Sequence, residues 1–217
     1  MPHVYHTCMI YRIDLHVHSR FSGDNNSDPE EAIIHGIGRD LQGIAFTEHY
    51  SYEASEHAEQ LRKKYRGQIM VFRGVEFSSL EGHCLVFGVN TDRLSLKNAS
   101  IQEVVHVVNE NGGVVIPSHP FRGANSVGEK IHQVEGLCAL EGYNGYSHYY
   151  QNTKAVRAAE ELHLPVTGGS DAHLPGEVGA CHTEFHNEVT YDTFVDLLRG
   201  GEYRGVDTRK ISKVWPF

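Results

Sequence analysis

Short apolar segments alternate with amphipathic ones along the whole chain of 217 residues. This alternation is typical of β-α units arranged around a parallel sheet. The apolar segments predict strands over Met9–Leu15, Gly43–Phe46, Ile69–Val75, His83–Val89, Gly113–Ile116, Gly136–Leu140 and Leu164–Thr167, with a weaker one near Tyr203–Val206. Apolar residues at helical spacing predict helices over Pro29–Gly38, Tyr52–Tyr65, Ile101–Asn111, Gln151–Leu162 and Tyr191–Arg199. About seven such units suggest a closed or nearly closed barrel.

The first helix has the clearest predicted start. Asp28 is the expected N-cap, Pro29 takes the first helical position and Glu31 follows three residues after the cap. No internal repeat, low-complexity tract or linker divides the sequence. We therefore expect residues 1–217 to form a single domain.

Composition and charge narrow the class of protein. A hydrophobic content of 40% with 22% charged residues is ordinary for a soluble globular protein, which sets disordered and collagen-like classes aside. The formal net charge of -9 argues against a protein that wraps duplex nucleic acid, because neutralising phosphates needs clustered Lys and Arg. A small anionic substrate held by bound cations is compatible with this charge.

The cysteines and the N-terminus bear on the cellular compartment. Cys8, Cys84, Cys138 and Cys181 lie far apart and show no CxxC spacing, so reduced thiols are expected. The apolar stretch within Met1–Arg12 is too short for a signal peptide, and no run approaches the roughly 18 apolar residues of a membrane span. We expect a cytoplasmic protein with no membrane partner, and the sequence leaves its oligomeric state open.

The chain contains 16 histidines, and imidazole is a common ligand of zinc, manganese and iron. Nearly every polar cluster falls at the C-terminal end of a predicted strand, where the loops of a parallel barrel converge. In the segment DLHVHS, strand alternation puts His16 and His18 on the same side, able to hold one ion. Asp24 follows in the loop SGDNN, which alone indicates an ordinary turn.

Ionisable residues also follow the second and third predicted strands directly. His49 ends the segment FTEH, and Glu76 stands in GVEFS. A buried carboxylate or imidazole normally needs a partner or a metal, so both are better explained as ligands than as core residues. Glu48 would point away from His49 and is expected at the surface or behind a ligand side chain.

Further histidines mark the later strands. His83 opens the fourth predicted strand in GHCLVFG, and His119 follows the fifth in SHPF; each alone could be a structural histidine. The segment GGSDAH repeats the acid-x-His alternation through Asp171 and His173, and its glycines let the backbone approach a crowded centre. Together these clusters at successive strand ends predict a metal-dependent hydrolase.

The order of DLHVHS, TEH, GVEFS, GHCLVFG, SHPF and GSDAH resembles the polymerase-and-histidinol-phosphatase (PHP) family of phosphoesterases over almost the whole chain. The resemblance implies an α/β fold, a distorted (β/α)7 TIM-like barrel, with up to three metal ions at the C-terminal ends of its strands. It implies a first ion held by His16, His18, Glu76 and Asp171, a second held by the bridging Glu76 with His83 and His119, and a third held by Asp24, His49 and His173. Some relatives have histidine in place of Asp24.

Such a centre predicts a hydrolase acting on phosphoric esters. Two or three divalent ions, of zinc, manganese or iron, would supply a bridging hydroxide for attack on phosphorus and stabilise charge on its oxygens. Arg122 in HPFR is the candidate to bind a phosphate oxygen, with a surface salt bridge as the alternative and Arg20 as a second candidate. His173 or His49, or else water on the third ion, would protonate the leaving alkoxide.

The segment after the sixth predicted strand bears on the substrate. Glu141 could orient a ligand histidine, and the tyrosines from Tyr143 to Tyr150 could stack on a base or pack against a helix. The expected substrate is a small phosphomonoester, a nucleotide or an oligonucleotide end. Two other interpretations stay open, namely amidohydrolase-type hydrolysis of a C–N bond and a non-catalytic metal-binding accessory module.

Overall fold

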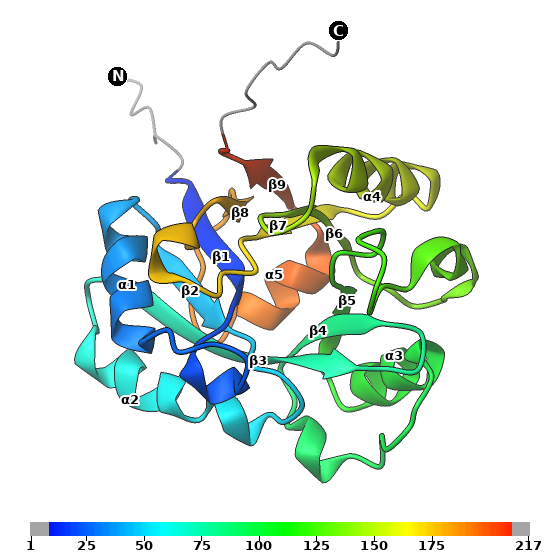
Figure 1. Cartoon of the computed structure of the whole chain (residues 1–217), viewed down its shortest axis with the longest axis horizontal. Coiled ribbons are helices and arrows are strands. Elements are labelled where there is room, and N and C mark those ends of the chain that lie inside the picture. The colour runs from blue at the N-terminus through cyan, green and yellow to red at the C-terminus, as the bar shows by residue number, and fades with distance from the viewer. Residues whose placement is uncertain (1–8, 210–217) are drawn as a thin grey trace, which may run out of the picture.

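Seven strands form one curled sheet in the computed structural model, which describes residues 9–209. The order across this sheet is β5-β4-β3-β2-β1-β8-β9, and β6 and β7 pair with each other separately (Figure 1). The strands are β1 (Tyr11–Val17), β2 (Gly43–Phe46), β3 (Met70–Ser78), β4 (His83–Phe87), β5 (Val114–Pro117), β6 (Leu140–Asn144), β7 (Val166–Gly169), β8 (Cys181–Phe185) and β9 (Tyr203–Asp207). The α-helices of the described chain are α1 (Pro29–Gly38), α2 (His57–Lys64), α3 (Ile101–Glu110), α4 (Tyr149–Glu161) and α5 (Phe194–Gly200).

Only part of the sheet consists of parallel strands. β1, β2 and β3 pair in parallel, as do β6 and β7, whereas β4, β8 and β9 join their neighbours in antiparallel pairs. The α/β class is confirmed, but the structure has a curled sheet in place of the full (β/α)7 barrel that was predicted, because the regular alternation of parallel strand and helix does not extend over the whole sheet. Between β3 and β4 the chain has only residues 79–82, too few for the crossover that parallel strands require.

Three elements differ from the prediction. The sequence predicts the sixth strand over Gly136–Leu140, but β6 begins only at Leu140, and Gly136 lies in a bend with a φ of 80°. The helix predicted over Tyr52–Tyr65 is divided into a 3-10 turn at Glu53–Ser55 and the shorter α2. β8 was not predicted, because its sequence CHTEF alternates polar residues that are nonetheless buried.

Helix ends and apolar packing hold the strand ends in place. The Asp28 side chain caps α1, as predicted, by accepting a hydrogen bond of 2.8 Å from the Glu30 backbone N–H. Ser100 and Glu103 form a capping box at the start of α3. One apolar cluster joins the last residue of β1, Val17, to β2 and to α1 and α2. The polar residues that follow β1 and β2 therefore start from fixed backbone.

β7 runs very close to β1 and β8, and glycine makes this approach possible. A Cβ atom added at Gly169 would lie 2.4 Å from the Cβ of His16, and one at Gly168 would lie 2.4 Å from the His182 carbonyl oxygen. Neither distance is sterically possible for a side chain. The two glycines therefore bring Asp171 next to His16, as the sequence segment predicted.

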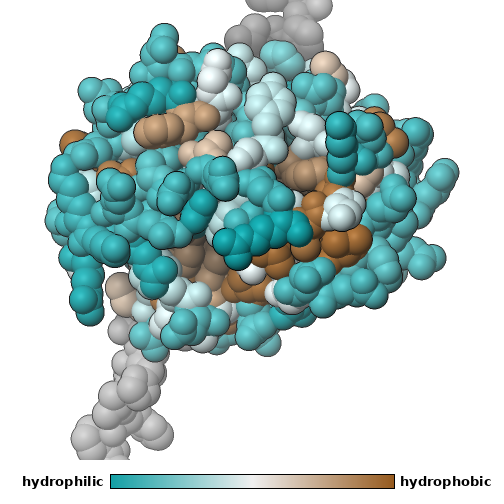
Figure 2. Space-filling view, turned by 90° about the horizontal axis from the view of Figure 1, so that it is seen from below, coloured by the Kyte–Doolittle hydropathy of each residue, from teal (hydrophilic) through white to brown (hydrophobic). Residues whose placement is uncertain are grey.

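One face of the molecule is mostly hydrophilic (Figure 2). Hydrophilic side chains cover most of the face seen in Figure 2, and apolar ones are exposed in a hollow at its centre. Within residues 9–209, no helix combines the length and apolar character needed to cross a membrane.

Cys84, Cys138 and Cys181 are free thiols, whereas Cys8 lies outside the described residues. That residues 1–217 form one domain stays a prediction.

Candidate metal centre

The predicted ligand residues all meet at one end of the strands. They come from segments far apart in the sequence, and each has at least one ring nitrogen or carboxylate oxygen close to another member of the group: His16, His18, Asp24, His49, Glu76, His83, His119, Asp171 and His173. The side chain of Glu76 has no exposed surface and lies at the middle of the group. We call this group the metal centre cluster.

Four buried atoms in the cluster form a cage. His16 Nε2 and His18 Nε2 are 3.0 Å apart, and Glu76 Oε2 and Asp171 Oδ1 lie 3.2–3.4 Å from these nitrogens. Ligands about 2.0–2.1 Å from a zinc ion would form a tetrahedron with edges of roughly 3.4 Å. The size and the donor types of the cage therefore fit a first-row divalent ion. This set equals the ligand set that the family resemblance implied for the first ion.

Glu76 also faces a second set of imidazoles. Its Oε1 lies 2.8 Å from His119 Nε2 and 3.2 Å from His83 Nδ1. Its Oε2 lies 3.2 Å from His49 Nδ1. One carboxylate thus touches three histidines beyond the cage, as the bridging role implied by the resemblance requires. His49 approaches Glu76 as well as Asp24, so it lies between the second and third predicted groups.

Asp24 completes the outer side of the cluster. Its Oδ2 lies 3.0 Å from His173 Nε2 and 3.1 Å from His49 Nε2. Nitrogens of His18, His49 and His173 also lie close enough together to share one ion. The Asp24 side chain is 37% exposed and the His173 side chain 26%, whereas the cage is buried. This outer group is therefore the part of the cluster that solvent reaches.

Several buried polar atoms of the cluster lack hydrogen-bond partners in the part of the chain that the structure describes. They are Glu76 Oε2, His49 Nδ1 and His83 Nδ1. A buried polar atom without a partner is costly, and native proteins satisfy nearly all of them. A cation between these atoms would satisfy all three at once, so the residues present fit a bound metal.

A layer of buried polar side chains holds the ligands in orientation. His16 Nδ1 lies 2.8 Å from Glu141 Oε1, which confirms the contact expected for Glu141. Ser118 donates a hydrogen bond of 2.7 Å to Glu76 Oε1. Ser22 Oγ lies 2.9 Å from His18 Nδ1 and donates to Glu48 Oε2. Glu48 is therefore buried behind a ligand rather than at the surface.

Asn144 connects this layer to the cage, and the sequence analysis assigned it no role. Its amide nitrogen donates to Asp171 Oδ2 at 3.1 Å and to Glu141 Oε2 at 3.0 Å. Ser22 and Ser118 were also assigned no role. The available signal was position, because Ser118 precedes His119 directly and Asn144 ends β6. Short polar side chains are too common at strand ends for position alone to identify them.

Two of the predicted ligands have backbone conformations that are rare for residues with a side chain. Asp171 has a φ of 54° and His119 a φ of 33°. Left-handed backbone at non-glycine residues costs roughly 1–3 kcal/mol and persists where the surroundings impose it. Here the Asp171 N–H donates to the His16 carbonyl at 2.7 Å, and the His119 N–H to Glu141 Oε2 at 2.7 Å. The fold therefore imposes these conformations to aim the two side chains at the centre.

Charge coupling within the cluster shifts its pKa values strongly. Burial acts to lower the pKa of His18, but the carboxylates of Asp171 and Glu76 beside its ring raise it to about 9. Burial and the neighbouring His18 lower the pKa of His49 to about 4. Burial acts to raise the pKa of Glu76, but His16 and its other imidazole neighbours hold it well below its usual range. The centre is thus built to keep carboxylates ionised among histidines.

The two predicted substrate-binding arginines have different surroundings. Arg122 reaches the cluster, where Nη1 donates to Asp171 Oδ2 and Nη2 lies 2.9 Å from His119 Nε2. Arg20 instead forms an ion pair of 2.5 Å with Asp28 and lies over the Phe21 ring. Arg122 is therefore the arginine that the fold brings to the centre.

Tyr146 lies at the exposed side of the centre. Its ring is 62% exposed, with its centroid 5.7 Å from that of His173 and 5.7 Å from the guanidinium carbon of Arg122. Its backbone N–H donates to Asn144 Oδ1 at 3.0 Å, which fixes the turn. Of the tyrosines in this segment, Tyr146 is thus held beside the centre rather than packed into a helix.

Comparison with known proteins identifies the family. The sequence matches the family model of the PHP domain over residues 14–155 and that of the PHP-associated region over residues 150–203. The chain belongs to the PHP domain family. This agrees with the resemblance seen in the sequence segments.

Solved structures show the same fold at low sequence identity. PsfC from Pseudomonas syringae PB-5123 superposes with a TM-score of 0.70 at 19% identity, covering 92% of this chain and 92% of that one. A putative metal-dependent phosphoesterase from Bifidobacterium adolescentis gives 0.63 at 17% identity, covering 87% and 96%. The lesion-specific endonuclease PfuEndoQ from Pyrococcus furiosus gives 0.68 at 17% identity, covering 91% of this chain and 58% of that one.

Proposed function

We propose that this protein is a metal-dependent phosphoesterase that cleaves a small phosphorylated substrate at the metal centre cluster. The observation that carries the proposal is the contact between the cage and Arg122. The four cage atoms have the spacing of a metal site, and a guanidinium stands directly beside Asp171. A cation site next to an arginine suits a phosphate group, because both bind its oxygens.

The proposal assigns the ligands as the family resemblance implied. His16, His18, Glu76 and Asp171 would hold one ion, with His83, His119, His49, Asp24 and His173 available for one or two more. Divalent cations at these residues would activate water as the nucleophile and stabilise negative charge on the phosphoryl oxygens. Zinc, manganese and iron are all compatible with mixed imidazole and carboxylate ligands.

The protein's own side chains have distinct parts in this proposal. Arg122 would exchange its contact with His119 for a phosphate oxygen while Asp171 keeps its guanidinium oriented. With the outer group free of metal, His173 is the better candidate to pass a proton to the leaving oxygen, because its ring is 26% exposed and Asp24 lies 3.0 Å from Nε2. With an ion bound there, water on that ion would take this part. His49 is less suited, since its lowered pKa leaves it neutral near pH 7.

Metal analysis combined with a phosphate-release assay tests the proposal. Protein loaded with zinc, manganese or iron should release phosphate from a panel that includes p-nitrophenyl phosphate and nucleoside monophosphates. The double variant H16A/H18A should bind less metal and lose turnover while circular dichroism shows a folded chain. Retained activity in this variant would contradict the assignment.

The same assays separate the two alternatives. A loaded protein that hydrolyses amides but no phosphoester would be an amidohydrolase-type enzyme. Less than one bound ion per chain, with no activity after metal addition, would support a non-catalytic module. Either result would overturn the phosphoesterase proposal.

A further inference from the structure

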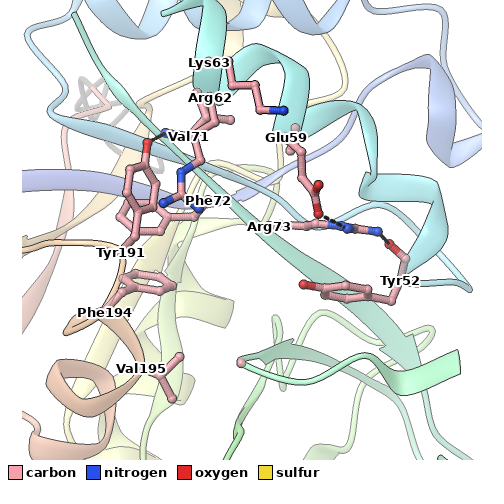
Figure 3. A pocket seen from close by; sticks show the side chains of 12 residues that line it. Tyr52, Glu59, Arg62, Lys63, Val71, Phe72, Arg73, Tyr191, Phe194 and Val195 are labelled. Carbon is pink, nitrogen blue, oxygen red and sulfur yellow. Dashed lines mark hydrogen bonds and ion pairs between the residues drawn. The ribbon is translucent and has the colours of Figure 1, made fainter. Parts of the chain in front are cut away.

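A groove that contains no residue of the metal centre cluster lies along β3. Its volume is about 590 Å³, and its walls come from α2, from β3 and from the start of α5 (Figure 3). Pockets that bind small molecules commonly measure roughly 300–1,000 Å³. The groove is therefore large enough for a ligand of about nucleotide size.

The groove exists because β3 and β4 form a hairpin. Ser78 pairs with His83 beside the metal centre cluster, and Gly74 pairs with Phe87 towards the other end of the hairpin. Gly88, which follows β4 at this other end, lines the groove. A regular β/α unit would place a crossover helix after β3, but the hairpin omits it and leaves the space between α2 and α5.

Two of the cations in the groove have no acidic partner among the described residues. Arg73 is fully engaged, since it bonds to Glu59 at 2.5 Å, to the Tyr52 carbonyl at 2.9 Å and to Ser55 Oγ at 3.2 Å. Within residues 9–209, the side chains of Arg62 and Lys63 form no ion pair and no hydrogen bond. Both lie in the last turn of α2, where the helix dipole favours cations. The helix dipole accounts for the presence of cations at this end of α2. It does not explain why the Arg62 side chain extends into the groove.

Arg62 is held in place by an aromatic ring. Its guanidinium carbon lies 3.2 Å from the centroid of Tyr191, and the Tyr191 hydroxyl accepts a hydrogen bond of 3.2 Å from the Val71 N–H (Figure 3). Stacking leaves the N–H groups at the guanidinium edge available to an acceptor. The structure therefore presents a fixed anion-binding group at the rim of the groove.

Apolar and aromatic surface completes the site. Phe72 and Phe194 stack below it with centroids 4.0 Å apart, and the partly exposed Tyr52 and Val195 line its sides. The three cations face a single carboxylate, that of Glu59, in a chain whose formal net charge is -9. A positive, aromatic groove on an acidic protein complements a ligand that carries both a negative charge and a planar ring.

We propose that this groove is a second ligand site, which binds an anionic ligand with a planar ring, the chemistry of a nucleoside monophosphate. Arg62 and Lys63 bind the phosphate, and the base packs against Val195 and beside Tyr52, whose ring carries the Arg73 guanidinium carbon 4.1 Å from its centroid. The site is independent of the reaction at the metal centre, so the proposal does not rest on the proposed function.

Calorimetric titration of adenosine 5′-monophosphate tests the proposal with full-length protein kept metal-free by a chelator, which prevents turnover. Wild type should bind one equivalent, and R62Q should bind at least about tenfold more weakly, because a charge-assisted bond is lost. The control K64Q also removes one positive charge from α2. Lys64 forms an ion pair with Glu30 and does not line the groove. The affinity of K64Q should stay within about twofold of wild type.

Titrations with other variants and other ligands locate the bound nucleotide. R122Q should bind the nucleotide like wild type, because Arg122 belongs to the metal centre. Ribose 5-phosphate and adenosine should each bind at least about tenfold more weakly than the nucleotide, since each lacks one half of the recognition. K63Q provides a second groove variant if R62Q does not fold. Absence of nucleotide binding, loss of binding in R122Q, or wild-type affinity in the folded groove variants would overturn the proposal.

Discussion

Glu141 Oε1 lies 2.8 Å from His16 Nδ1, and Glu141 Oε2 accepts the backbone N–H of His119 at 2.7 Å. One buried carboxylate thus orients a cage histidine and fixes the left-handed backbone of another ligand. Such contacts set the ring tautomer, because a proton held at Nδ1 leaves the Nε2 lone pair free for a metal.

The first prediction therefore concerns Glu141. E141Q removes the charge that holds the His16 proton, and should weaken metal binding by roughly 10–100-fold without unfolding the chain. Competition with a chromophoric chelator measures the affinity. E160Q, at an exposed position of α4, is the matched control and should bind metal like wild type. Equal affinities in the two variants would show that Glu141 does not orient the ligand.

The sequence predicted which residues meet in the metal centre cluster better than it predicted the strands that carry them. His16 and Glu76 stand among apolar residues, where an ionisable side chain normally needs a partner, and Asp171 stands in an acid-x-His alternation. These local signals do not depend on the topology of the sheet. His83 shows the limit, because it opens its strand although sites of parallel barrels form at strand ends. The antiparallel pairing of β4 with β3 resolves this, since it puts the start of β4 beside the end of β3.

The supporting residues were harder to predict for a physical reason. Asn144 touches Asp171 only because β6 pairs with β7 in one register, and Ser22 meets Glu48 only through a turn after β1. These contacts depend on tertiary geometry that no local pattern encodes. β8 was missed for a similar reason, because its polar residues are buried by neighbours distant in the sequence.

A second prediction tests the close approach of β7 to β1. G169A would place a Cβ atom 2.4 Å from the His16 Cβ, so the strands must separate. Overpacking of this kind costs about 1–3 kcal/mol of unfolding free energy, measurable by urea denaturation. It should also weaken metal binding by displacing His16. G176A is the control, since nothing lies within 4 Å of an added Cβ there. Equal stability of the two variants would contradict the argument.

A third prediction concerns protons and metal. His18 holds a proton in the metal-free protein, because the carboxylates of Asp171 and Glu76 overcome burial and raise its pKa to about 9. Burial acts to lower the pKa of His16, but Asp171 and Glu141 raise it as well, so a metal must displace a proton from both rings. Its apparent affinity should therefore rise with pH through about pH 9. Calorimetry at pH 7 in two buffers of different ionisation enthalpy should detect proton release on binding. The same titration at pH 10 should release fewer protons, and equal release at both pH values would contradict the assignment.

The last prediction addresses Tyr146 and rests on the proposed phosphoesterase activity. A phosphate bound at Arg122 would place its leaving group near the exposed Tyr146 ring, 5.7 Å from the guanidinium carbon. Stacking on an aromatic side chain contributes about 1–3 kcal/mol for a planar group. Y146A should therefore raise KM for phenyl phosphate by roughly tenfold or more with little change in kcat, whereas Y146F should stay near wild type. Glycerol phosphate has no ring to stack, so its KM should change little in either variant. A parallel loss of kcat on both substrates would instead mean that Tyr146 supports the turn at Asn144.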